Sequence, residues 1–493
     1  MDSTQSLAWF VPELILSGTV LVLIFFDLIA VQRDERASGV GIVALAGAIA
    51  AVVTSLALWG AAPTWLFGRM IVLDPFAVFF KVLLGLSLVA AILMSLGSRE
   101  VAGRANEGEY YTLLVSSGLG MLLMASAGNL LMAYLSLEFV SLTSYVLTGF
   151  LRHNRRSGEA ALKYLIYGGV ASGAMIYGMS WIFGLTGSMD YGVIAQRVVA
   201  LDAQSQGALF VALLLVLAGF GYKISAVPFH MWAPDVYTGA PIPVTAFLAV
   251  GSKAAGFAIL LRFFNFGIGD AAESVVPGGV AFLSLFMAIC FLTMTLGNLA
   301  ALPQQNVKRL LAYSSIAHAG YALLGVVVFR EEGVRAALVY LAVYYLMNLG
   351  AFWVVMLVAN QTGREDVESY HGLAWRGGAA PAVALTVFLA SLAGLPPLAG
   401  FIGKFYVFAA GIRGGAVALV VAGALNSVVS LYYYFRIVKA MFFEEPTVDE
   451  ATLQFPPFGV GALVALATLT IVLGVYFGPL YDVAGTAMHV FRG

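Results

Sequence analysis

Long apolar segments constrain this chain more than any other feature of its sequence. A bilayer core of about 30 Å needs about 20 apolar residues per helix. The chain divides into fourteen such segments, at 8–30, 38–60, 72–97, 110–127, 129–151, 160–186, 207–239, 241–264, 277–300, 307–329, 334–360, 380–412, 415–442 and 456–480. Only 10% of the residues are charged, and the mean hydropathy is +0.94. We therefore predict an all-α polytopic membrane protein with fourteen transmembrane helices in a lipid bilayer.

The loops between these segments carry positive charges unequally. One face has thirteen, namely Arg33, Arg36, Arg99, Arg104, Arg152, Arg155, Arg156, Lys308, Arg309, Arg364, Arg376, Arg436 and Lys439. The opposite face has seven, namely Arg69, Arg197, Arg262, Arg330, Arg335, Arg413 and Arg492. By the positive-inside rule the first face is cytoplasmic, so both termini are predicted to lie on the outer face. The net charge of -1 argues against a nucleic-acid partner.

Charged side chains also lie inside the apolar segments. Five of the seven lysines do so, namely Lys81, Lys163, Lys223, Lys253 and Lys404. A charge at the centre of a membrane helix costs about 2.5 to 3.5 kcal/mol, so these five and Glu138 together would cost about 15 to 20 kcal/mol. We infer that these groups are paired, hydrated or neutral for part of the time, as is typical of groups that carry protons or ions. Static ion pairing is the alternative.

The sequence gives little support to cofactor chemistry. The single cysteine, Cys290, lies in an apolar run, so no cysteine-ligated iron–sulfur cluster and no disulfide can form. The run Gly219-Phe220-Gly221 lacks the third glycine and the βαβ unit of a dinucleotide site. The loops 187–206 and 361–379 are too short for a soluble catalytic domain. We predict no metal or cofactor site in this chain and expect any redox chemistry in other subunits.

The chain contains two similar halves. Residues 133–138 resemble 312–317, and residues 160–165 resemble 336–341, at offsets of 179 and 176. If the repeat has five helices, the second copy crosses the membrane in the opposite direction, because five is odd. The predicted divisions are 1–107 with helices one to three, 108–265 with the first repeat of helices four to eight, 266–442 with the second, inverted repeat of helices nine to thirteen, and 443–493 with helix fourteen.

Prolines interrupt one segment in each repeat. Segment 207–239 contains Pro228 and Pro234, and segment 380–412 contains Pro396-Pro397. A proline inside a helix removes a hydrogen bond and clashes with the carbonyl four residues back. The two effects destabilise the helix by about 3 kcal/mol. In a membrane the freed backbone must be satisfied by protein or water. Broken helices in corresponding positions favour an ion path near the midplane, and plain proline kinks are the alternative.

Polar residues recur at helical spacing in four segments. These stripes are Tyr134, Glu138, Ser141 and Tyr145 in 129–151, Thr245 and Lys253 in 241–264, Ser314 or Ser315 with His318 and Tyr321 in 307–329, and Tyr340, Tyr344 and Asn348 in 334–360. Their spacing puts each set on one face of its helix. We predict that the stripes line a hydrated seam. Interhelical hydrogen bonding is the alternative for the serines and tyrosines.

Three runs resemble a known family. They are FGYKISAVPFHMWAPDVYTGAP at 220–241, NVKRLLAYSSIAHAGY at 306–321 and LPPLAGFIGKF at 395–405. All three are similar to the antiporter-like membrane subunits of NADH-quinone oxidoreductase, respiratory complex I. The residues 234–241 favour the subunit N family, the bacterial counterpart of mitochondrial complex I subunit 2. The resemblance covers essentially the whole chain.

The resemblance implies roles for single residues. The implied proton relay consists of Glu138, Lys223, Lys253, His318 and Lys404. Glu138 and Lys223 would form an ion pair, and His318 would bridge the two halves, with a merely satisfied core histidine as the alternative. Lys163 would have a supporting role, and the role of Lys81 is left open.

The family also implies a function. The chain would be a proton-translocating subunit of an enzyme complex that couples electron transfer from NADH to a quinone such as ubiquinone with proton pumping. FMN, iron–sulfur clusters and the quinone would be bound by partner subunits, and the neighbours would be other antiporter-like and peripheral subunits. The implied location is the respiratory chain of a bacterial inner membrane. The alternatives are a subunit of a multisubunit cation/proton antiporter, which needs no NADH-oxidising partner, and a purely structural membrane subunit.

Overall fold

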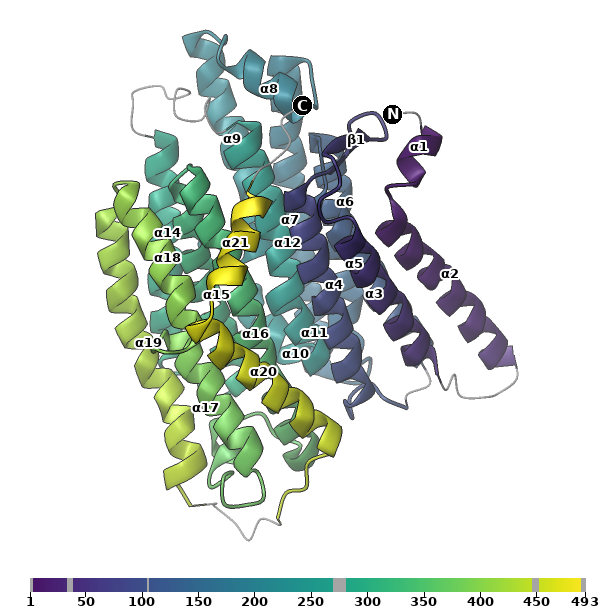
Figure 1. Ribbon diagram of the computed structural model, residues 1–493, viewed down its shortest axis with the longest axis vertical. Helices are drawn as coiled ribbons and strands as arrows, with labels where there is room; N and C mark the ends of the chain where they lie inside the picture. Colours follow the sequence, from purple (N-terminus) through teal and green to yellow (C-terminus); the bar gives the residue numbers. More distant parts are fainter. Residues whose placement is uncertain (1–2, 33–38, 104–105, 269–280, 446–451, 489–493) are drawn as a thin grey trace.

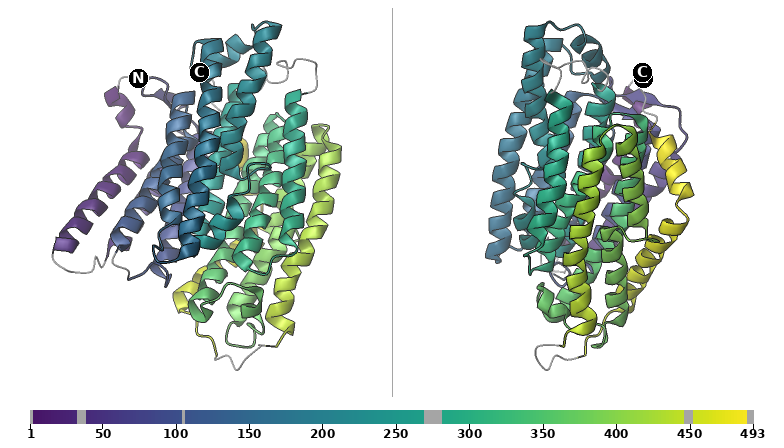
Figure 2. Two further views of the ribbon diagram at one scale, coloured as in Figure 1. Left: turned by 180° about the vertical axis from the view of Figure 1, so that it is seen from behind. Right: turned by 90° about the vertical axis from the view of Figure 1, so that its left-hand side faces the viewer.

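Long helices stand side by side along the bundle (Figures 1 and 2). The computed structural model describes residues 3–32, 39–103, 106–268, 281–445 and 452–488. The long helices are α2 (Val11–Gln32), α3 (Val40–Ala57), α4 (Pro75–Leu96), α5 (Glu107–Ala125), α6 (Leu130–Thr148), α7 (Arg155–Thr186), α9 (Ala203–Ile224), α14 (Ala281–Ala301), α15 (Val307–Val327), α16 (Glu331–Thr362), α17 (Ala379–Ala393), α18 (Ala399–Arg413), α19 (Val417–Phe443) and α20 (Pro457–Val475). Between α9 and α14, one continuous helix is formed by α11 (Ile242–Phe247), η1 (Leu248–Ser252), α12 (Lys253–Leu260) and η2 (Leu261–Gly267).

The structure confirms the all-α membrane architecture. Twelve helices among the described residues are long and apolar enough to cross a membrane. The two other predicted segments correspond to α5 and to the pair α17 and α18. The described helix ends lie within five residues of the predicted boundaries. The start of segment 277–300 lies outside the described residues, as do Arg33, Arg36, Arg104 and Arg492 of the charge count.

Short elements gather at one end of the bundle, here called the hairpin face. They are the hairpin of β1 (Thr64–Leu66) and β2 (Ile71–Leu73) and the helices α1 (Ser3–Leu7) and α8 (Tyr191–Val198), and α21 (Gly478–Ala487) runs toward them (Figure 1). The opposite end is here called the Lys308 face, and it includes the turn η3 (Val367–Tyr370). These elements are too short to show apolar periodicity, and none of them was predicted; residues 72–73 of β2 and 478–480 of α21 lie inside the predicted segments 72–97 and 456–480.

Both predicted helix breaks are present. Residues 225–232 separate α9 from α10 (Ala233–Gly239), and residues 394–398 separate α17 from α18. Ser225 and Gly394 begin the two breaks in the left-handed conformation, with φ of 61° and 91°. Several consecutive residues leave the helix at each place. The alternative interpretation, a plain proline kink in a continuous helix, is therefore wrong for both segments.

The centre of the bundle consists of almost fully buried helices. The segment Ile242–Asn265 is entirely buried, and α15 and α16 are nearly so. Their side chains meet only other protein groups, so each polar residue on them must find its partners inside the protein. These helices carry Lys253, His318 and Tyr340 of the predicted stripes. The fold therefore places much of the candidate relay at the centre of the molecule.

Two charged pairs are buried near the first helices of the chain. Lys81 Nζ lies 2.7 Å from Glu13 Oε1, and both side chains are fully buried. Arg262 donates from two nitrogens to the two oxygens of Asp74, each at 2.9 Å. Lys81, whose role was left open, therefore joins α4 to α2. Counting Arg262 among the loop charges was wrong, because it is buried inside the bundle and holds η2 to the start of α4.

We predict that breaking the Arg262 pair destabilises the fold. The change Arg262→Leu removes the bidentate partner of the buried Asp74 carboxylate. We expect it to lower the free energy of unfolding by about 3 to 5 kcal/mol. Thermal unfolding of the purified protein in detergent measures this loss. Arg413→Leu is the matched control, because the Arg413–Glu332 pair is exposed and contributes about 0 to 1 kcal/mol. Equal losses in the two variants would contradict the prediction.

Candidate functional site

Glu138 and Lys223 face one seam from α6 and α9. Lys223 Nζ donates to the hydroxyl of Ser141 at 3.2 Å, and Ser141 lies about one turn beyond Glu138 on the same stripe. Glu138 Oε1 has no hydrogen-bond partner among the described residues. Within the same residues, no nitrogen–oxygen contact of 4.0 Å or less joins Glu138 to Lys223. The structure brings both residues to the seam, and their direct ion pair stays a prediction.

Aromatic rings fill the space between α7 and the first helix break. The Trp232 ring stacks on Tyr164 at 4.4 Å between centroids, and its indole N–H donates to the Tyr222 carbonyl at 3.0 Å. Tyr145, the last member of the α6 stripe, packs edge-on against Tyr164 at 4.8 Å. The break after α9 therefore turns an aromatic ring back onto the end of that helix. Only Tyr145 of this cluster belongs to a predicted stripe, because the other members come from separate segments and share no periodicity.

Lys163 lies apart from the seam. Its Nζ is 2.6 Å from Glu159 and 2.7 Å from Asp235, and its side chain is 38% exposed. Asp235 also accepts a hydrogen bond from Arg309 at 2.6 Å, which links α7, α10 and α15. Lys163 lies in the ninth position of α7 and has two carboxylate partners there. Its supporting role in transport stays a prediction.

Lys253 reaches from α12 to α15. Its Nζ donates to the carbonyl of Ser315 at 2.7 Å and also to the Ser315 hydroxyl. The Tyr237 hydroxyl lies 3.5 Å from the same serine oxygen. Lys253 follows directly after the π-helical turn η1 and is only 2% exposed. Its amine is thus buried against neutral oxygen atoms.

His318 connects α15 to two further helices. Its Nδ1 lies 2.6 Å from the Tyr340 hydroxyl of α16, and its Nε2 lies 3.2 Å from the Tyr434 hydroxyl of α19. A neutral imidazole donates from one nitrogen and accepts at the other, so this ring can pass a proton between two hydroxyl groups.

Lys404 points back to the break that precedes its own helix. Its Nζ donates to the carbonyl of Ala393, the last residue of α17, at 2.9 Å. It also donates to the Ser427 hydroxyl at 3.0 Å and lies 4.6 Å from the centre of the Tyr321 ring. Helical side chains lean toward the N-terminus of their helix, which brings the amine to the break from several residues further on.

Three hydroxyl residues at the site were not predicted. Tyr434 bonds to the Ser314 hydroxyl as well as to His318, and Ser427 donates to the Tyr321 hydroxyl at 3.3 Å. Ser427 and Tyr434 are seven residues apart on α19, a helical spacing that would have identified them. Tyr237 gave no such signal, because it lies in a short helix after a break.

The chemistry of the site is that of proton donors and acceptors. Amines, one imidazole and several hydroxyl groups face one another inside the protein, and each of these groups can both donate and accept when the amines are neutral. No group of three His, Cys, Asp or Glu side chains suited to a metal ion occurs in the described parts of the chain. The Cys290 thiol is buried and donates to the Gly320 carbonyl at 3.2 Å.

Known proteins share this sequence and fold. A family model described as NADH:quinone oxidoreductase/Mrp antiporter, TM, matches residues 127–430. NADH-quinone oxidoreductase subunit N 2 of Sorangium cellulosum is 49% identical over 512 residues, covering 100% of this chain and 99% of that protein. A chain in the structure of respiratory complex I from Thermus thermophilus with bound aureothin is 33% identical, with a TM-score of 0.78 and coverage of 96% of this chain and 99% of that one.

A more distant structure extends the likeness. A chain of the Mrp complex from Dietzia sp. has a TM-score of 0.79 over 98% of this chain and 97% of that one. Its sequence is only 22% identical, so this likeness concerns the fold alone. From the matches to the family model and to the full-length relatives, the chain belongs to the NADH:quinone oxidoreductase/Mrp antiporter transmembrane family, within its NADH-quinone oxidoreductase subunit N branch.

Proposed function

We propose that this chain is a proton-translocating membrane subunit of NADH-quinone oxidoreductase. The observation that carries the proposal is a division among its seven lysines. Four pair with carboxylates, namely Lys81 with Glu13, Lys163 with Glu159 and Asp235, Lys308 with Glu365, and Lys439 with Glu444. The other three, Lys223, Lys253 and Lys404, have no carboxylate oxygen within 4.0 Å in the described parts of the chain.

The three unpaired lysines suit proton transfer for a physical reason. They are 2%, 2% and 5% exposed, and their hydrogen-bond partners are hydroxyl and carbonyl oxygens. A buried lysine that loses its proton beside a carboxylate leaves an unpaired charge, which is strongly unfavourable. A lysine among neutral oxygens leaves no such charge behind. It can therefore alternate between the charged and the neutral form.

The relay in this proposal runs through Glu138, Lys223, Lys253, His318 and Lys404. Residues 108–265 and 266–442 are its two inverted repeats, and Lys163 supports the first of them through Asp235. Moving one charge against 100 mV requires about 2.3 kcal/mol, which the complex supplies by reducing a quinone in partner subunits. Glu138 controls the relay, because its charge favours the protonated form of the nearby Lys223 amine.

The proposal extends to partners and location. Partner subunits bind FMN, iron–sulfur clusters and the quinone, and this chain contributes neither a metal site nor a redox centre. The membrane is the inner membrane of a bacterial cell. The Lys308 face lies toward the cytoplasm, and both termini lie on the outer side. The Lys308 face carries more positive loop charges, and removing Arg262 from the count of the other face increases this excess.

A subunit of a cation/proton antiporter is the second candidate, because the matched family includes the Mrp antiporters. An antiporter would exchange Na⁺ or K⁺ for protons without an NADH-oxidising partner. Purification from native membranes distinguishes the two. Comigrating flavin and iron–sulfur subunits with NADH-driven proton uptake support the proposal, and cation exchange by a complex without those subunits contradicts it.

We predict that Lys253→Arg slows proton pumping about tenfold or more, nearly as much as Lys253→Ala, because general acid–base transfer is lost. Arginine keeps the positive charge, but it stays protonated in proteins and releases no proton. NADH-driven proton uptake by inverted membrane vesicles measures the effect. Pumping near the wild-type rate in Lys253→Arg would show that Lys253 is a structural cation.

We also predict that Glu138 and Lys223 act as a coupled pair. Glu138→Gln and Lys223→Ala should each slow pumping in assembled complexes. When the rates are converted to activation free energies, the increase in the double variant should be smaller than the sum of the two single increases. Coupling of about 0.5 to 3 kcal/mol is expected for residues of one network. Strictly additive losses would mean that the two side chains act independently.

At the end of the relay, we predict that Lys404→Ala lowers the coupled NADH-quinone rate and proton uptake together. NADH oxidation with an artificial acceptor should stay intact, because that chemistry belongs to partner subunits. Both rates are measured on the same membranes. Equal loss of both would assign Lys404 to assembly, and no loss of either would place the end of the path elsewhere.

A further inference from the structure

A narrow groove of about 190 Å³ lies between α6 and α7, near the hairpin face. Apart from the hydroxyl groups of Tyr134 and Ser180, the side chains that line it are apolar. Leu131, Ile176 and Phe183 belong to this lining and are 41%, 44% and 45% exposed. The groove is therefore open along the outer surface of the helix bundle.

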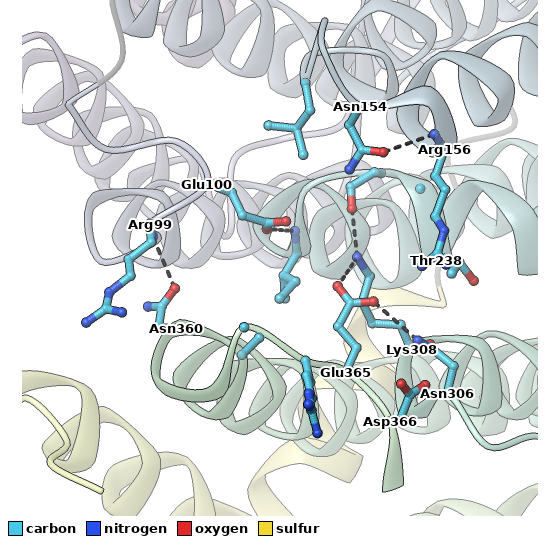
Figure 3. A pocket seen from close by; sticks show the side chains of 17 residues that line it. Arg99, Glu100, Asn154, Arg156, Thr238, Asn306, Lys308, Asn360, Glu365 and Asp366 are labelled. Atoms are coloured by element: carbon cyan, nitrogen blue, oxygen red, sulfur yellow. Dashed lines mark hydrogen bonds and ion pairs between the residues drawn. The ribbon is translucent and has the colours of Figure 1, made fainter. Parts of the chain in front are cut away.

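A larger cavity on the Lys308 face has the opposite character. It measures about 480 Å³, and Figure 3 shows the charged groups of Glu100, Lys308 and Glu365 and the amide of Asn360 within its lining. Groups of this kind bind water, so water fills such a cavity. The groove between α6 and α7 offers water few partners. An apolar group is therefore its favoured occupant.

The dimensions of the groove favour a thin occupant. Ile176 and Phe183 are seven residues apart on α7, so the groove runs about 10 Å along the helix, away from the hairpin face. An α-helix with its side chains is about 10 to 12 Å across, which is too wide for this space. An extended alkyl chain is narrow enough to lie between the two helices.

Two arginines lie at the end of the groove that is nearer the hairpin face. Arg69 Nε lies 3.5 Å from Asp190 Oδ2, and its side chain is 46% exposed. Arg197 is also exposed, and it donates to the carbonyl of Thr186, the last residue of α7. Both arginines thus contact the short segment that contributes Met189 to the groove.

An aromatic ring places this end of the groove at the edge of the membrane. The guanidinium carbon of Arg69 lies 5.0 Å from the centre of the Trp65 ring. Tryptophan rings are enriched at the level of the lipid headgroups. The Leu130 N–H donates to the Met189 carbonyl at 3.0 Å, which keeps the start of α6 at the same level. The groove therefore extends from the headgroup level toward the membrane interior.

We propose that this groove binds one acyl chain of a glycerophospholipid whose phosphate group lies at Arg69 and Arg197. The two arginines and Asp190 leave one positive charge, which the single negative charge of a phosphodiester balances. Phosphatidylglycerol is the favoured lipid, because its headgroup brings no ammonium group next to the arginines. The inference does not rest on the proposed function, because it concerns lipid binding alone.

The test uses the whole complex in vesicles that contain phosphatidylglycerol with a photoreactive diazirine in one acyl chain. After illumination, mass spectrometry of peptides locates the labelled residues. We expect stronger labelling of residues 130–134 and 176–189 than of residues 162–170. The latter lie on α7 outside the groove and measure unspecific contact with lipid.

Arg69→Gln tests the phosphate contact. We expect labelling of the groove at limiting lipid to fall about fivefold, because an arginine beside an anionic lipid contributes about 1 kcal/mol. Arg69→Lys keeps the charge and should label nearly as the wild type does. Arg413→Gln is the matched control, since Arg413 is an exposed arginine that also pairs with a carboxylate.

Ile176→Trp tests the chain contact independently. The larger ring fills the groove, so labelling of residues 176–189 should fall to the level of residues 162–170. Val170→Trp is the matched control, because Val170 lies on the same helix, is 71% exposed and does not line the groove. NADH oxidation with an artificial acceptor reports assembly of the complex in every variant.

Three outcomes would overturn the lipid site. Unchanged labelling in Arg69→Gln would remove the phosphate contact, and unchanged labelling in Ile176→Trp would show unspecific lipid contact only. The third outcome comes from a photoreactive benzoylphenylalanine at Leu131. If it crosslinks to a partner subunit instead of a lipid, the groove is a protein interface. Proton pumping is not measured in any of these experiments, so their failure leaves the proposed function untouched.

Discussion

An ammonium group inside a membrane protein must find oxygen atoms, and the choice of those oxygens separates the lysines of this chain by role. Lys81 has a fully buried carboxylate partner and acts as a fixed link between α2 and α4. Lys253 and Lys404 instead donate to backbone carbonyls and hydroxyl groups. Carboxylate partners hold a proton in place, while neutral partners let it leave. The buried central helices make this difference effective, because they keep bulk water from supplying other partners.

The two helix breaks solve one backbone problem with different side chains. A broken helix leaves carbonyl groups without their usual donors, and each must be satisfied inside the protein. At the first break the Trp232 indole donates to the Tyr222 carbonyl. At the second break the Lys404 ammonium donates to the Ala393 carbonyl. The second break thus binds a buried ammonium group directly, whereas the first is closed by an aromatic ring.

Buried carboxylate pairs and the seam of neutral hydroxyl groups lie in separate parts of the molecule. The pairs Glu13–Lys81 and Asp74–Arg262 hold the first helices to the central bundle with carboxylates that are fully or almost fully buried. Both members of such a pair stay charged, because neutralising or removing one of them leaves the other as an uncompensated buried charge. The central seam is held instead by hydroxyl groups and one histidine. Each of these groups can act as a hydrogen-bond donor or as an acceptor. Of the two pairs, Asp74–Arg262 holds η2, which continues the helix of Lys253, to the start of α4.

The sequence by itself determined the helices, both breaks and the helix faces that carry Glu138, His318 and Tyr340, because apolar length, proline and helical spacing are local properties. It did not determine which buried charges are paired. Arg262 looked like a loop charge, and the pairing of Lys163 was not predicted, because their partners Asp74 and Asp235 are distant in the sequence. Only the tertiary structure, which brings distant helices into contact, decided which lysines face carboxylates and which face neutral oxygens.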